Sequence, residues 1–205
     1  KSLTDKIDQI KDIKGKVNYV FLSDHGMVEA DTKSTIAYPT VDDKKFHMSV
    51  DETMIQLYAK DASDANGIKD CYDALVKAKG VAVNYDIYLR KDVPVHLKYS
   101  TVHDKHNRIG DILLMAKSPF QFFKEETKKD GSKTKPKAGT HGYDPTEVSD
   151  THAIFFAWGP AFNKATISGF NNVDVYPLVA HLLGIKYTNQ IDGAASTLVN
   201  TTVLK

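Results

Sequence analysis

The sequence predicts an α/β domain with a mainly parallel sheet flanked by helices. Apolar, strand-like runs alternate along the chain with amphipathic, helix-like segments, a pattern that is typical of α/β proteins. One run, residues 17–22, is nearly unbroken and is bounded by Gly15 and by polar residues, as expected for a strand buried on both faces. The length of 205 residues is enough for one domain with a sizeable core.

The individual elements follow from apolar periodicity and from end signals. Three helices are expected, each closed by a glycine: one on Leu3, Ile7 and Ile10 before Gly15, one from a Ser63 cap to Lys79 before Gly80, and one over 175–183 before Gly184. Besides residues 17–22, strands are expected at residues 54–59, 97–100, 112–116 and 153–158.

Charge and cysteine content limit the possible functions. The net charge of +1 produces no strong overall field, so no nucleic-acid-specific binding is expected. No apolar run approaches the 18 or so residues of a membrane span, so no transmembrane segment is expected. Because Cys71 is the single cysteine, a metal site in this chain would have to use histidine and carboxylate ligands.

Residues 124–139 are rich in lysine and lack apolar periodicity. This composition predicts a flexible loop. Two interpretations remain open for its lysines. They form a solvated surface, or they draw an anionic substrate towards the nearby His141.

The first candidate site is the pair Asp24 and His25, directly after the apolar run 17–22. Ligands of open α/β sheets bind at the carboxyl ends of strands, and Gly26 lets the chain turn sharply there. A carboxylate oxygen and an imidazole nitrogen suit Zn²⁺, with bonds of roughly 2.0–2.2 Å. The alternative is that Asp24 caps a turn and His25 is a polar loop residue.

The second candidate is His141, which lies between Gly139 and Gly142, ahead of the run 153–158. Small neighbours leave its imidazole open to close approach, as a metal ligand requires. The alternative is an ordinary turn residue. No chemistry is assigned to the remaining histidines, which are His47, His96, His103, His106, His152 and His181.

These two sites belong to a series of six sequence blocks with a common resemblance. The blocks are Leu22–Met27, Tyr88–Pro94, Arg108–Ile112, Gly139–Asp144, Phe156–Phe162 and Asn172–Pro177. In order and spacing they resemble the second half of the catalytic domain of the ectonucleotide pyrophosphatase/phosphodiesterase family, in the alkaline phosphatase superfamily. The resemblance implies that residues 1–205 are the C-terminal half of a phosphodiesterase catalytic domain with an alkaline-phosphatase-like fold.

The resemblance also implies a site with two Zn²⁺ ions. Asp24 and His25 would hold one ion, together with an aspartate and a threonine nucleophile from the N-terminal half. His141 would hold the second ion, with an aspartate and a histidine from that half. This chain would therefore supply metal ligands and no catalytic nucleophile. Pro145 departs from the family, which usually has asparagine at that position.

The implied reaction is hydrolysis of phosphodiester or pyrophosphate bonds in nucleotides or related small molecules. The implied partner is the N-terminal half, as a second chain or an absent segment, since the nucleophile, the remaining ligands and further strands of the sheet would come from it. The sequence starts without an initiator methionine, as expected for part of a longer precursor. The chain alone is then expected to be inactive. The family implies an extracellular or periplasmic location, and any membrane anchor would lie outside this chain. The alternatives are a sulfatase, phosphonate hydrolase or phosphomutase of the same superfamily, and a non-catalytic fragment.

Overall fold

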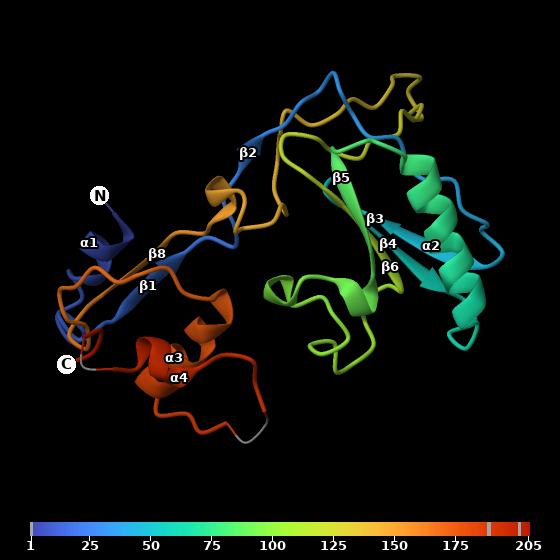
Figure 1. The fold of residues 1–205 in the computed structure, drawn as a ribbon. Coiled ribbons are helices and arrows are strands. Elements are labelled where there is room, and N and C mark those ends of the chain that lie inside the picture. The colour runs from blue at the N-terminus through green and yellow to red at the C-terminus, as the bar shows by residue number, and fades with distance from the viewer. Residues whose placement is uncertain (1, 188–189, 201) are drawn as a thin grey trace. The chain divides into compact units, whose positions relative to one another are not determined.

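The computed structural model describes residues 2–187, 190–200 and 202–205 (Figure 1). Contacts divide the chain into two compact units. Unit 1 comprises residues 1–23 and 154–205, and unit 2 comprises residues 24–153. Within the described ranges, none of the helices has the length and apolar character needed to cross a bilayer.

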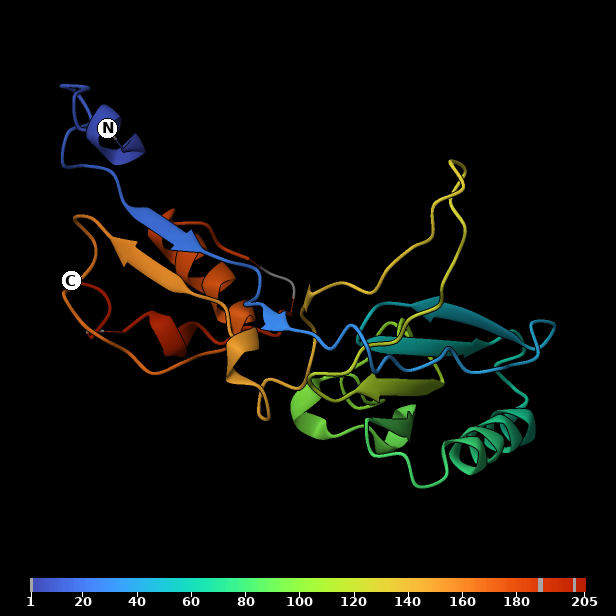
Figure 2. The same ribbon diagram turned by 90° about the horizontal axis from the view of Figure 1, so that it is seen from above.

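Unit 2 contains a four-stranded sheet in which every neighbouring pair is antiparallel (Figure 2). In sheet order, the strands are β3 (Phe46–Val50), β4 (Met54–Ala59), β6 (Ile112–Ala116) and β5 (Tyr85–Leu89). Side-chain alternation along β4 places Ile55 and Leu57 in the core, where both are fully buried. Because the apolar run of β6 is buried almost throughout, the two central strands form the core of the unit.

Helix α2 (Ala65–Lys79) packs beside β5 and matches the predicted helix closely. Its cap differs from the prediction. The side chain of Asp64, rather than that of Ser63, accepts a hydrogen bond from the amide of Gly67 at 2.8 Å. Leu75 is the residue that α2 buries in the core of unit 2.

Unit 1 contains a two-stranded antiparallel sheet of β1 (Tyr19–Leu22) and β8 (Phe155–Trp158). Its helices are α1 (Leu3–Ile7), α3 (Val175–Leu182) and α4 (Ala195–Leu198). One face of the sheet packs on Leu178 of α3 and Leu198 of α4, both fully buried. Helix α1 buries none of its residues.

The opposite face of the β1–β8 sheet is aromatic and exposed. Tyr19 stacks on Trp158 with ring centroids 5.0 Å apart, and Phe21 lies beside Phe156 at 6.5 Å. The exposed fractions of Phe21 and Phe156 are 55% and 59%. The prediction that residues 17–22 are buried on both faces is therefore wrong within this chain.

Two further predictions about the fold need correction. Every ladder between named strands in the described ranges is antiparallel, so these strands do not form a mainly parallel sheet. A tight turn at residues 51–53 joins β3 to β4, and only antiparallel strands can be joined in this way. The strand expected at 97–100 is instead the end of η2 (Val95–Leu97), followed by Lys98 in a left-handed conformation. The remaining 3₁₀ turns are η1 (Arg90–Asp92), η3 (Ser149–Thr151) and η4 (Asn172–Asp174).

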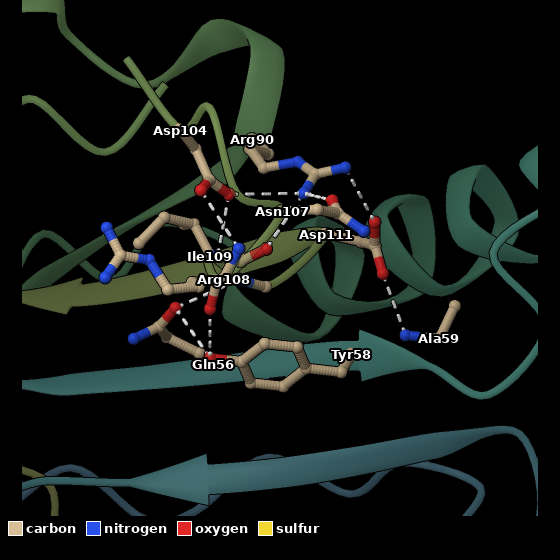
Figure 3. Close-up of polar contacts among 10 residues, drawn as sticks. Gln56, Tyr58, Ala59, Arg90, Asp104, Asn107, Arg108, Ile109 and Asp111 are labelled. Atoms are coloured by element: carbon tan, nitrogen blue, oxygen red, sulfur yellow. Dashed lines mark hydrogen bonds and ion pairs between the residues drawn. The ribbon is translucent and has the colours of Figure 1, made fainter. Parts of the chain in front are cut away.

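A charged network holds the loop of residues 98–111 against the sheet (Figure 3). The Arg90 guanidinium lies 3.6 Å from a carboxylate oxygen of Asp104 and 3.4 Å from one of Asp111. Asp104 also accepts two main-chain N–H groups of the same loop, at 2.9 and 2.8 Å. Asp111 accepts the amide of Ala59 at 2.9 Å, which connects the network to β4.

The lysine-rich segment forms a hydrogen-bonded hairpin that projects from unit 2 (Figure 2, yellow). Thr127 and Lys133 pair across it. At its base, the buried side chain of Gln121 donates to the carbonyl of Lys137 at 2.7 Å. The segment predicted as a loop thus has a defined stem, and its effect on substrate stays a prediction.

Candidate metal centre

Asp24 and His25 lie in a tight turn directly after β1. The imidazole Nδ1 of His25 is 2.7 Å from the carbonyl oxygen of Gly26. Because a carbonyl can only accept, Nδ1 is the donor, and Nε2 of the neutral ring carries the free lone pair. This Nε2 lies 3.3 Å from Oδ2 of Asp24. The turn therefore presents a carboxylate oxygen and an imidazole nitrogen side by side.

Gly26 is tightly enclosed in this turn. Its amide donates to the carbonyl of Thr151 at 2.9 Å. A Cβ atom at this position would lie 2.0 Å from the carbonyl oxygen of Asp150. The close approach of two main-chain segments therefore requires glycine, for lack of space rather than for backbone conformation.

A short ladder between β2 (Val28–Glu29) and β7 (Gly139–Thr140) brings His141 next to His25. It pairs the residues that follow His25 with those that precede His141. The two imidazoles stack, with ring centroids 3.6 Å apart and planes inclined by 19°. The structure thus brings together the three residues predicted as metal ligands, all within unit 2.

The loop that carries His141 is fixed on both sides of the histidine. The hydroxyl of Thr53 donates to the main-chain carbonyl of His141 at 2.9 Å. The next core side chain, Tyr143, is 4% exposed and donates to the carbonyl of Phe120 at 2.8 Å. Burial raises the pKa of Tyr143 to about 12, so its hydroxyl stays protonated and can donate.

Asp144 is held by a histidine that sequence reasoning left without a role. Nε2 of His96 lies 2.8 Å from one carboxylate oxygen of Asp144, and Thr146 donates to the other from its amide at 2.8 Å and from its hydroxyl at 2.7 Å. Burial acts to raise the pKa of Asp144, but the hydrogen bonds from Thr146 and His96 outweigh it and lower that pKa. Asp144 thus makes a local turn with Thr146, and the His96 contact adds a second anchor.

Two more carboxylates lie beside the His141 loop, on the β3–β4 turn. A hydrogen bond with Asp51 and the ion pair with Lys137 lower the pKa of Glu52 to about 2. The same hydrogen bond, together with burial, raises the pKa of Asp51, while positive charge on His141 acts to lower it. Negative charge on this turn favours a cation at the His141 loop.

The donor set fits zinc only in part. Two ligand atoms of a tetrahedral zinc with bonds of about 2.0–2.1 Å lie roughly 3.3–3.4 Å apart, and the Asp24 and His25 atoms are 3.3 Å apart. Across residues 2–187, 190–200 and 202–205, however, no group of three or more His, Cys, Asp or Glu side chains is arranged to hold a metal ion. Further ligands would have to complete each coordination sphere.

Comparisons with known proteins identify a family. The profile described as "Type I phosphodiesterase / nucleotide pyrophosphatase" matches residues 1–144. Ectonucleotide pyrophosphatase/phosphodiesterase family member 5 of Homo sapiens is 31% identical over 172 residues, which cover 82% of this chain and 32% of the relative. The chain thus spans about a third of the length of this curated relative.

Solved structures agree with the sequence match. The human ectonucleotide pyrophosphatase/phosphodiesterase 5 is 26% identical with a TM-score of 0.71, and the match covers 97% of this chain and 48% of that chain. An inactive threonine-to-alanine variant of the murine protein in complex with AMP is 25% identical with a TM-score of 0.69, over 95% of this chain and 47% of that chain.

Proposed function

Because the chain belongs to the type I phosphodiesterase / nucleotide pyrophosphatase family, we propose that it is the C-terminal half of a metal-dependent hydrolase for phosphodiester or pyrophosphate bonds. It has the alkaline-phosphatase-like α/β fold of its solved neighbours. The observation that carries the proposal is the stack of His25 on His141, with Asp24 beside His25. The murine relative that binds AMP supports a nucleotide as substrate, and its inactive threonine variant supports a threonine nucleophile in the absent half.

The residues of this chain would divide two Zn²⁺ ions between them. Asp24 and His25 would hold one ion and His141 the other, each completed by ligands of the N-terminal half. Such ions would stabilise charge on phosphate oxygens and activate the threonine hydroxyl. In this chain, the bond from His25 Nδ1 to Gly26 fixes the tautomer that leaves Nε2 free. The Tyr143 and β7 contacts hold the loop that carries His141 in place.

The assay for this proposal uses the complete catalytic domain, on a nitrophenyl nucleotide ester. His25→Ala and His141→Ala should each reduce hydrolysis to background while the fold persists, because each removes a metal ligand. His181→Ala, at an exposed histidine of α3, is the matched control and should retain activity. Near-normal turnover by either ligand variant would rule out the assignment. Faster cleavage of sulfate esters or phosphate monoesters would favour another branch of the superfamily.

The aromatic face of β1 and β8 supports the N-terminal half as partner. Exposed faces of this kind mark interaction surfaces, and the solved human relative is about twice as long as this chain. We propose that the absent half covers Phe21 and Phe156.

The complete protein would act at the extracellular or periplasmic side, and cell fractionation that finds it in the cytosol would contradict this location.

The chain on its own provides a test of the covered face. Residues 1–205 should self-associate and bind a hydrophobic dye, because Phe21 and Phe156 are more than half exposed. The double substitution Phe21→Ser with Phe156→Ser should reduce both signals. Val81→Ser, at a residue of unit 2 that is 97% exposed, should leave them unchanged. A monomeric wild-type chain that binds no dye would contradict the partner assignment.

A further inference from the structure

The strongest unassigned feature of the site is a buried hydroxyl beneath His141. Thr53 is 3% exposed, and its hydroxyl donates to the carbonyl of His141 at 2.9 Å, across 88 positions of sequence. The main-chain carbonyl of Thr53 accepts the amide of Ala116 at 2.8 Å. Thr53 is therefore fixed to the central strand β6 and connects the His141 loop to the most buried part of unit 2.

We propose that Thr53 is a positioning residue that sets the direction of the His141 imidazole. The inference rests on the proposed metal-ligand role of His141. The hydrogen bond from Thr53 fixes the plane of the peptide that joins His141 to Gly142, and so limits the directions that the His141 side chain can take. If this peptide rotated, the ring would leave its 3.6 Å stack with His25.

The next residue shows how closely the loop approaches Thr53. Gly142 has a φ of 93°, a left-handed value that favours glycine. A Cβ atom on Gly142 would lie 2.6 Å from the Thr53 hydroxyl. The loop thus closes onto Thr53 only because residue 142 lacks a side chain. The anchors at Tyr143 and Asp144 act further along the chain, whereas Thr53 acts on His141 itself.

Hydrogen bonds that orient metal ligands have a measurable effect on affinity. Loss of such a bond typically reduces metal affinity by about 10–100-fold. In Thr53→Val the carbonyl of His141 would lose its buried donor while the side chain keeps nearly the same volume. Thr53→Ser keeps the donor.

The test uses the complete catalytic domain, in which the proposed N-terminal half supplies the remaining ligands, with Zn²⁺ alone as probe. Affinity is measured by competition with a chromophoric chelator, and the imidazole nitrogens are followed by NMR with ¹⁵N-labelled histidine. We expect Thr53→Val to weaken zinc binding about tenfold or more and to shift the His25 and His141 ring signals even without metal. Thr53→Ser should restore both. Thr53→Ala offers a second variant if Thr53→Val fails to fold.

Ser100→Ala is the matched control, because it removes a different buried hydroxyl, which pairs with His103 at 3.1 Å. If Thr53→Val changes neither the zinc affinity nor the histidine signals beyond what Ser100→Ala does, the positioning role is overturned. A wild-type catalytic domain whose His25 and His141 signals do not respond to zinc would instead count against the proposed ligands. In that case the metal-free ring signals still decide the role of Thr53.

Discussion

Replacement of Gly26 by alanine should disrupt the candidate site without altering any proposed ligand. The new Cβ would lie 2.0 Å from the carbonyl oxygen of Asp150 and 2.8 Å from that of His152. Real Cβ contacts are essentially never below 3.0 Å. The main chain that carries Asp24 and His25 must therefore move by about 1 Å relative to η3.

The energetic cost follows from this displacement. The displacement would break the 2.9 Å hydrogen bond from the Gly26 amide to the carbonyl of Thr151. This bond contributes about 1 kcal/mol to stability. Overpacking adds about 1–3 kcal/mol. The free energy of unfolding of unit 2 should therefore fall by roughly 2–4 kcal/mol, and the 3.3 Å approach of Asp24 to His25 should be lost.

Urea unfolding of the 205-residue chain measures the loss of stability, and zinc competition on the complete catalytic domain measures the loss of affinity. Gly169→Ala is the control, because its Cβ would meet nothing within 4 Å. If Gly26→Ala matched Gly169→Ala in both stability and zinc affinity, the steric reasoning would be refuted.

Three further outcomes are expected. Arg90→Met should lower the free energy of unfolding in urea by about 3–5 kcal/mol, because the Asp104 side chain, 2% exposed, would lose its cationic partner. A loss below about 1 kcal/mol would contradict this prediction and would mean that the main-chain N–H groups are enough to stabilise the Asp104 carboxylate. Burial acts to raise the pKa of Asp104, but the main-chain hydrogen bonds and Arg90 lower it below 3.8. The stability that ionised Asp104 gives to the fold should therefore be fully present above pH 3.8 and be lost as the pH falls through the lower pKa of the folded state. An Asp104→Asn variant with an unchanged acid unfolding profile would contradict this. Zinc binding should weaken at acid pH, since only a neutral imidazole can bind the metal. A pH-independent affinity would argue against ligation by His25 and His141.

Local sequence signals were sufficient for several elements, whereas the metal-ligand role of Asp24, His25 and His141 stays a prediction. Asp24 and His25 follow a strand and precede a glycine, and the expected strands at residues 54–59 and 112–116 have the observed bounds. These features depend on neighbours along the chain. The direction of strand pairing does not, since an apolar run is equally suited to a parallel or an antiparallel neighbour.

The contacts that support the site join distant parts of the chain. Thr53 lies 88 residues from His141, and His96 lies 48 residues from Asp144. Neither residue has a periodic or motif signal that would connect it to the site. The strands β3 and β5 were missed for a related reason, because polar residues interrupt their apolar runs and their burial comes from tertiary packing.

Anomalous diffraction at the zinc edge, on crystals of the complete catalytic domain, tests the central claim most directly. We predict two zinc peaks, one bonded to Asp24 and His25 and the other to His141, with ligand distances of roughly 2.0–2.2 Å. Zinc bound elsewhere, with His25 and His141 free of metal, would contradict the account.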